Sequence, residues 1–200
     1  MKKSHTALVV VGVIAVIGIC VVCGGLGTLQ SVQQQLLAKQ QAVERGNAQY
    51  SGALDIVSQK IVAAYDLADK QINHEDKVFQ ELAEARKAFA SAQSGASMPD
   101  QVAAAREFDL KFQALTESNP AFASAPVVQD SLNAVEEAVN EIFTAFQDQQ
   151  DYVYGYNTYR GTWFAPKFIG DMLGYPKSFE YYEGVMDKLD IHDLVATPAN

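Results

Sequence analysis

Residues 7 to 27 form an apolar run without a charged side chain, and this run limits the possible folds more than any other feature. As a helix its 21 residues span about 31 Å, which matches the roughly 30 Å hydrocarbon core of a bilayer. Inside lipid the backbone polar groups must bond within the segment, so a helix is the favoured form. The run therefore predicts a single-pass transmembrane helix, through which the chain contacts the lipid bilayer.

Two other targeting signals fit this run poorly. A cleaved signal peptide has an apolar stretch of about 7–15 residues followed by a small-x-small site, and this run is longer. A lipoprotein signal needs a small residue before its cysteine, but Ile19 precedes Cys20 and Val22 precedes Cys23. We interpret the two cysteines as small apolar residues of a membrane helix, with helix-to-helix contact as the alternative.

The lysines before the run predict the orientation. Lys2 and Lys3 precede it, whereas Lys39 and Arg45 lie well downstream, so the positive-inside rule favours a cytoplasmic N-terminus at residues 1–6. The remainder, from Thr28 on, contains no cysteine, which is compatible with a bacterial periplasm or cell exterior. The sequence thus predicts a protein of the bacterial inner (plasma) membrane whose body is periplasmic or extracellular.

The body is strongly acidic. From Thr28 on it has 13 basic and 24 acidic residues, a formal charge of −11. Nucleic-acid binding requires Lys and Arg to neutralise phosphates, so no nucleic-acid partner is expected. The same charge argues against binding to anionic lipid by charge alone.

Helical periodicity dominates residues 28–160. The first seam has an apolar residue every seven positions, while the companion positions Gln33, Gln40 and Asn47 are polar, which predicts weaker packing near the membrane. Capping residues lie at Asn73–Asp76, Ser97 and Asp100, and stop signals at Gly95 and Pro120. We therefore predict an all-α fold, an antiparallel bundle of four long helices. The seam residues are Leu29, Leu36, Val43, Tyr50, Val57 and Ala64 in the first helix, with Leu54, Ile61 and Ala68 beside them; Val78, Leu82, Ala85, Phe89 and Ala92 in the second; Val102, Ala105, Phe108, Phe112 and Leu115 in the third; and Val128, Leu132, Val135, Val139, Ile142, Phe146, Val153, Tyr156 and Arg160 in the fourth.

Aromatic residues concentrate at the end of the fourth helix and in the segment that follows it, between Tyr152 and Tyr182. Eleven of the 20 aromatics fall within 31 residues, and residues 161–184 are expected to form a cap with a short amphipathic helix at Lys167–Leu173, closed by Gly174. Because the fourth helix returns towards the membrane, this cap should dock on the membrane-near half of the first helix. An interfacial or partner-binding belt is the alternative interpretation. The acidic tail, residues 185–200, follows.

The same C-terminal segment resembles the LemA family. The motifs that carry the resemblance are Tyr156-Asn157 with Arg160, then Trp163-Phe164 with Pro166, then Gly174-Tyr175-Pro176-Lys177 with Phe179, and Glu183-Gly184; His74-Glu75, Glu84-Ala85-Arg86 and Asn119-Pro120 are also similar. The likeness extends over about Asn73 to Gly184. Upstream, the family's tryptophan, paired arginines and Ile-Pro-Asn-Leu segment are missing, so the chain resembles a divergent member. The resemblance implies a bacterial protein in which one N-terminal membrane helix carries a helical bundle, without an established enzymatic activity.

The sequence offers little catalytic or metal-binding chemistry. A di-iron bundle needs Glu-x-x-His pairs, and none of the three histidines, His5, His74 and His192, has that spacing. No Gly-x-Ser-x-Gly motif occurs. We therefore expect no catalytic residues, no metal and no cofactor, and interpret His74-Glu75-Asp76 as a helix cap.

Arg160 is the remaining charged candidate, with Asp148, Asp151 and Asp171 nearby in sequence. It forms either an exposed ion pair or an anchor that fixes the aromatic cap. The leading functional hypothesis is a non-enzymatic interaction or scaffold module that binds another membrane or envelope protein or its own copies. A ligand-sensing bundle that relays to a separate membrane partner is the alternative. The candidate interaction or cap residues are Tyr156, Asn157, Arg160, Trp163, Phe164, Pro166, Phe168, Gly174, Tyr175, Pro176 and Phe179.

Overall fold

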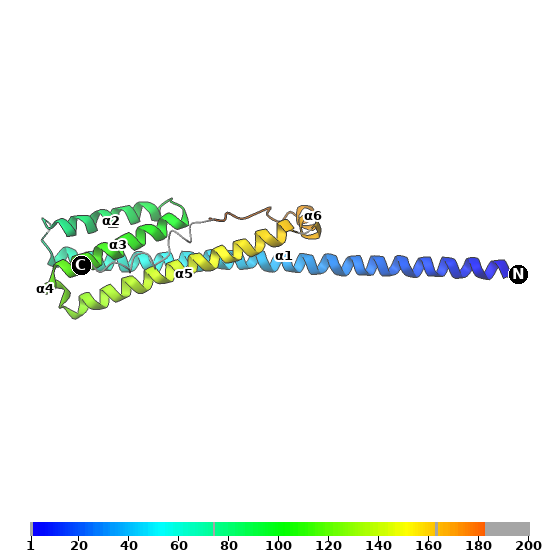
Figure 1. The fold of residues 1–200 in the computed structure, drawn as a ribbon, viewed down its shortest axis with the longest axis horizontal. Helices are drawn as coiled ribbons and strands as arrows, with labels where there is room; N and C mark the ends of the chain where they lie inside the picture. The colour runs from blue at the N-terminus through cyan, green and yellow to red at the C-terminus, as the bar shows by residue number, and fades with distance from the viewer. Residues whose placement is uncertain (1, 74, 163, 183–200) are drawn as a thin grey trace, which may run out of the picture. The chain divides into compact units, whose positions relative to one another are not determined.

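The computed structural model describes the backbone of residues 2–73, 75–162 and 164–182, and the side chains of residues 27, 29–73, 75–161 and 164–182. Within these ranges the fold is all-α, as predicted, with six helices and no strand (Figure 1). The acidic tail at 185–200, Trp163 and His74 lie outside the described residues. The helices are α1 (Lys2–Gln71), α2 (Lys77–Gln93), α3 (Met98–Ser118), α4 (Pro120–Ala123), α5 (Pro126–Thr162) and α6 (Phe164–Leu173).

The predicted membrane span falls in the N-terminal part of α1. Among the described residues, no helix is both long enough and apolar enough to cross a membrane. The side chains of residues 7–26, which make up nearly all of the predicted span, lie outside that description.

The chain divides into two compact units. The first consists of residues 1–43 and 153–179, and the second of residues 44–152 and 180–200. We refer to them as the cap unit and the bundle unit. Both α1 and α5 contribute one part to each unit.

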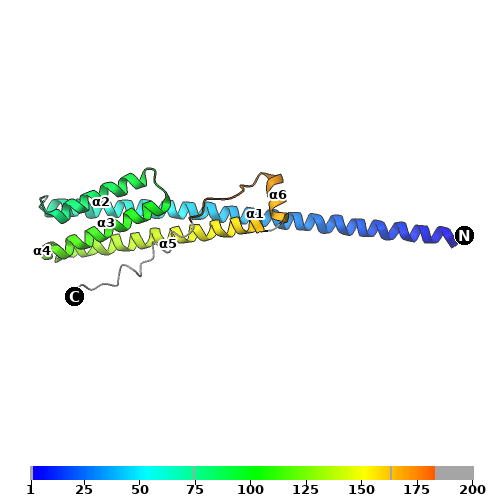
Figure 2. The same ribbon diagram turned by 45° about the horizontal axis from the view of Figure 1, so that its top comes forward.

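In the bundle unit α1, α2, α3 and α5 run alternately in opposite directions, as an antiparallel bundle does (Figures 1 and 2). Their ends follow the sequence signals. Asp76 caps α2, where its Oδ1 accepts a hydrogen bond from the Val78 amide at 2.8 Å. Ser97 precedes α3, and Pro126 begins α5. The stop signal at Pro120 does end α3, but the four residues that begin with this proline form the single turn of α4.

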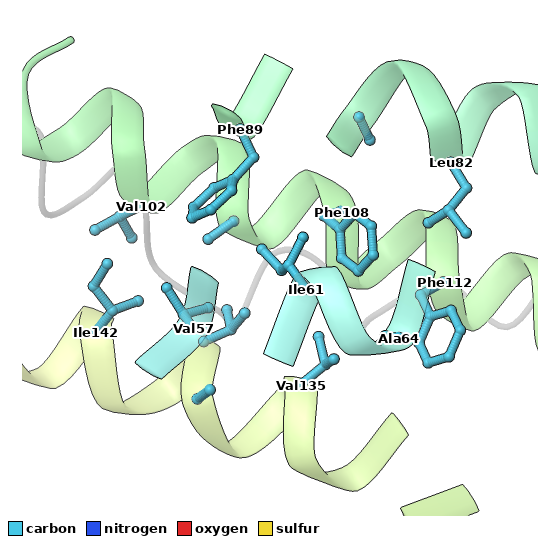
Figure 3. Close-up of a cluster of buried hydrophobic side chains, with 14 of the residues drawn as sticks. Val57, Ile61, Ala64, Leu82, Phe89, Val102, Phe108, Phe112, Val135 and Ile142 are labelled. Carbon is cyan, nitrogen blue, oxygen red and sulfur yellow. The ribbon is translucent and has the colours of Figure 1, made fainter. Parts of the chain in front are cut away.

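Most buried residues of the bundle core belong to the predicted seams (Figure 3), and the core also contains residues that were not predicted: Ala53, Phe79, Phe122, Ala138 and Phe143. Phe108 and Phe112 of α3 are completely buried, and their rings stack with centroids 6.2 Å apart. Of the α1 seam only Leu29 is exposed. The polar position Asn47 does not weaken a core, because its side chain is exposed and its Oδ1 accepts a hydrogen bond from Gln149 Nε2 at 3.0 Å.

Gly46 allows a close approach between α1 and α5. A Cβ placed there would lie 2.8 Å from Tyr152 Cδ2 and 3.2 Å from Gln149 Cα, whereas a Cβ at Gly52 would meet nothing within 4 Å. We therefore expect Gly46→Ala to destabilise the bundle by about 1–3 kcal/mol through overpacking. Gly52→Ala is the matched control and should stabilise it by about 0.5–1 kcal/mol, because alanine is the better helix former. If chemical denaturation shows that the free energy of unfolding changes in the same direction in both variants, this packing is contradicted.

The buried carboxyl group of Asp109 should make the stability of the fold depend on pH. Burial, opposed by a hydrogen bond from Gln113 and supported by the nearby Glu136, raises the pKa of Asp109 to about 6. Because the unfolded value is about 3.9, its contribution to stability is complete below about pH 4 and is lost as the pH rises through 6. The carboxylate keeps some access to water, so we expect Asp109→Asn to stabilise the fold by about 1–2 kcal/mol at pH 7. Denaturation at pH 4 should show no gain in stability for Asp109→Asn. An equal gain in stability at pH 4 and pH 7 would refute the raised pKa of Asp109.

Candidate functional site

The cap unit has its own small core, in which the end of α5 packs on α1. The buried members are Leu36 and Val43 of α1, Val153 and Tyr156 of α5, and Ile169 of α6. Val32, Tyr159, Tyr175 and Phe179 pack around them. The sequence predicted this docking of the aromatic segment on the first helix, and the candidate residues Tyr156, Tyr175 and Phe179 belong to this core.

Tyr156 is the central side chain of this core. It is fully buried, and its hydroxyl donates a hydrogen bond to the Pro176 carbonyl at 2.6 Å. Its ring meets the ring of Phe179 edge to face, with centroids 4.8 Å apart. Burial raises the pKa of Tyr156 above its ordinary value, as expected for an enclosed hydroxyl. Tyr156 therefore holds the chain that follows α6 against α5.

Asn157 holds the same chain through a pair of reciprocal bonds. Its Nδ2 donates to the Phe179 carbonyl at 2.9 Å, and its Oδ1 accepts from the Phe179 amide at 2.9 Å. An amide side chain carries both a donor and an acceptor, so it can satisfy both backbone groups of one residue. The Tyr-Asn pair thus binds residues 176–179 as an extended strap.

Arg160 is an anchor, and the alternative of an exposed ion pair is wrong. Its side chain is only 3 % exposed. Nη1 donates to the Lys167 carbonyl at 2.7 Å, and Nη2 pairs with Asp171 Oδ1 at 2.6 Å. Of the three nearby acids, the structure therefore pairs Arg160 with Asp171 of α6. Both contacts fix α6 to the end of α5.

Gly170 makes room for this anchor, and sequence reasoning missed it. A Cβ there would lie 2.5 Å from Arg160 Nε and 2.7 Å from its Cζ. That Nε is buried without a hydrogen-bond partner. Gly174 then ends α6 with a φ of +76°, and the Tyr175 amide donates to the Gly170 carbonyl at 2.9 Å, which is a Schellman cap.

One face of α6 is apolar and exposed. Phe164 is 82 % exposed and Phe168 57 % exposed, and their rings stack with centroids 5.9 Å apart. Met172 is one further turn along, and Leu173 is also exposed, whereas Pro166 and Ile169 face inward. Phe164 and Phe168 are therefore surface residues, not members of the cap core. We refer to Phe164, Phe168 and Met172 as the α6 apolar face.

A shallow basic cleft lies beside that face. It measures about 220 Å³ and is lined by Arg160, Gly161, Lys167, Asp171 and Lys177. Three of these residues are cationic and one is anionic. Lys177 and Lys167 come from outside the predicted interaction set, and only the fold brings them next to Arg160.

The bundle unit carries two open grooves between α1 and α5. One, of about 540 Å³, is lined by small or apolar residues including Gly52, Ala53 and Ile56 of α1 and Ala145 of α5. Glu141 and Asp148 flank it. The second, of about 640 Å³, lies further along the same two helices, between Lys60–Lys70 and Val127–Ala134. A surface of small side chains lets another helix approach closely.

In the part of the chain that the structure describes, no group of three or more His, Cys, Asp or Glu side chains could hold a metal ion. The comparison with protein-family models gives no match, and the comparison with curated proteins gives no significant one.

Proposed function

We propose that the chain is a membrane-anchored, LemA-like helical bundle that serves as a non-enzymatic interaction or scaffold module at the bacterial cell envelope. The observation that carries the proposal is the continuity of α1. This helix runs from Lys2 to Gln71, so the apolar run and the bundle seam belong to one element. If the apolar run crosses the bilayer, this helix would tether the body of the chain to the membrane.

The α1–α5 grooves have features that support the proposal of a protein partner. They combine small and apolar residues with a charged border, which resembles the apolar centre and polar rim of protein interfaces. Gly52 would let the backbone of a partner helix come close to α1, and the exposed Ile56 beside it would give that helix an apolar contact. We propose that a helix of another envelope protein, or of a second copy, occupies this surface.

Site-specific photocrosslinking in cells tests the interaction. A benzophenone amino acid at the exposed groove position Thr144 should give a discrete crosslinked species, whereas the same group at exposed Ala114 of α3 is the control. Gly52→Arg should abolish that species, because the long side chain fills the groove without a steric clash at its Cβ. Equal crosslinking at the groove and control positions, or no effect of Gly52→Arg, would contradict the proposal.

The proposed topology puts the body outside the cytoplasm. Lys2 and Lys3 support this orientation. Protease added to cells with an opened outer layer should digest the body. Digestion only after the inner membrane is broken would reverse the orientation.

The ligand-sensing hypothesis differs from this proposal in the site that it requires. A small-molecule sensor needs a concave pocket with converging polar groups. The α1–α5 groove at Gly52, Ala53 and Ala145 is open and half of its lining side chains are small, which favours a helix over a small ligand.

A further inference from the structure

The charges of the body are divided unevenly between the two units. The body part of the cap unit, residues 28–43 and 153–179, has four basic residues and one acid, a net charge of +3. Residues 44–152 and 180–200 have 9 basic and 23 acidic residues, a net charge of −14. The body as a whole is therefore acidic, although the part that belongs to the cap unit is basic. Its basic residues are Lys39, Arg160, Lys167 and Lys177, and its acid is Asp171.

The α6 apolar face lies close to the end of the apolar run in α1. The cap core includes Val32 of α1, which is five residues beyond Gly27, or about 7.5 Å along the helix axis. The headgroup layer on each side of a bilayer is about 5–8 Å thick. A helix is about 5–6 Å in radius with its side chains, so α6 at this level would reach the headgroups.

The orientation of α6 also fits a membrane surface. Figures 1 and 2 show α6 lying across the direction of α1, at the end of α5 nearest the N-terminal part of α1. If α1 crosses the bilayer, α6 then lies along its surface. Phe164, Phe168 and Met172 follow each other at intervals of four residues, on the side of α6 opposite to buried Pro166 and Gly170. This is the pattern of an interfacial helix, with aromatic and apolar side chains on one side.

We propose that α6 rests on the surface of the bilayer that anchors α1. The α6 apolar face enters the boundary between headgroups and acyl chains. The basic cleft of Arg160, Lys167 and Lys177 faces the phosphates of anionic phospholipids. Arg160 is already held by Asp171, so Lys167 and Lys177 supply most of the attraction to phosphate. The inference rests on the proposed membrane anchor.

Depth-dependent fluorescence quenching tests this placement in the full chain. With Cys20 and Cys23 replaced by alanine, an NBD fluorophore is attached at Met172→Cys, or at Ala114→Cys on α3 as the control. The protein is reconstituted into phosphatidylcholine vesicles with or without phosphatidylglycerol, and lipids carry a nitroxide high on the acyl chain. We expect strong quenching at position 172 and only background quenching at position 114.

A charge variant tests the basic cleft. Lys167→Gln with Lys177→Gln should weaken quenching at position 172 in vesicles with phosphatidylglycerol, and added salt should do the same in the unsubstituted protein. In pure phosphatidylcholine the double variant should have little effect. If the double variant changes quenching at position 172 equally in both kinds of vesicle, the role assigned to the cleft is overturned.

The outcomes separate this inference from the proposed anchor. Alkaline carbonate applied to the same vesicles shows whether the chain is anchored. An anchored chain whose label at position 172 behaves like the control overturns the inference alone. A label shielded from aqueous iodide but not quenched by lipid would assign the α6 apolar face to a protein partner, which also overturns it. Release of the chain by carbonate would instead overturn the anchor.

Discussion

Replacing Tyr156 with alanine is expected to open the aromatic cap and destabilise the cap unit by about 3–5 kcal/mol. The substitution removes a fully buried ring, its contact with Phe179 and the donor to the Pro176 carbonyl. The matched variant Tyr156→Phe keeps the ring and loses only the hydrogen bond, so it should cost about 0.5–1.5 kcal/mol.

Hydrogen exchange of the full chain in detergent micelles measures this effect locally. The Phe179 amide, which donates to Asn157, should lose protection in Tyr156→Ala and keep most of it in Tyr156→Phe. Unchanged protection in the alanine variant would mean that the strap is not held by Tyr156.

Phe108→Ala should have an effect of similar size in the bundle unit, about 3–5 kcal/mol, because it leaves a cavity in the core shared by the four long helices. Leu110→Ala, at a residue that is 46 % exposed on the same helix, is the control and should cost far less. Denaturation monitored by circular dichroism compares the two. Similar losses of stability in both variants would contradict the burial of Phe108.

The helices and their ends could be predicted from the sequence because their signals are local. Asp76 caps α2 with its side chain, and Ser97 holds the N-cap position of α3. The seven-residue seam of α1 is buried from Leu36 to Ala64, as its period indicates. The short turn α4 was missed because Asn119-Pro120 reads as a stop signal, and the helical turn begins at that same proline.

The candidate site was predictable only in outline. The sequence identified Tyr156, Asn157 and Arg160 as candidates. It left three acids as possible partners of Arg160, and only the tertiary packing selects Asp171. The need for glycine at position 170 depends on where the guanidinium lies, which no local pattern reveals. Likewise, the sequence left open whether Phe164 and Phe168 belong to the cap or to an interaction surface, because an aromatic residue has the same sequence signal in a core and on a surface; the structure shows both exposed.

Alkaline carbonate extraction of membranes that contain the full chain is the most direct test of the membrane anchor at residues 7–27. The account predicts that the intact chain stays in the membrane pellet after carbonate and high salt and is released only by detergent. Ile17→Arg, which places a charge near the middle of the run at a cost of about 2.5–3.5 kcal/mol, should increase the released fraction. Release of the intact, unsubstituted chain by carbonate alone would contradict the account.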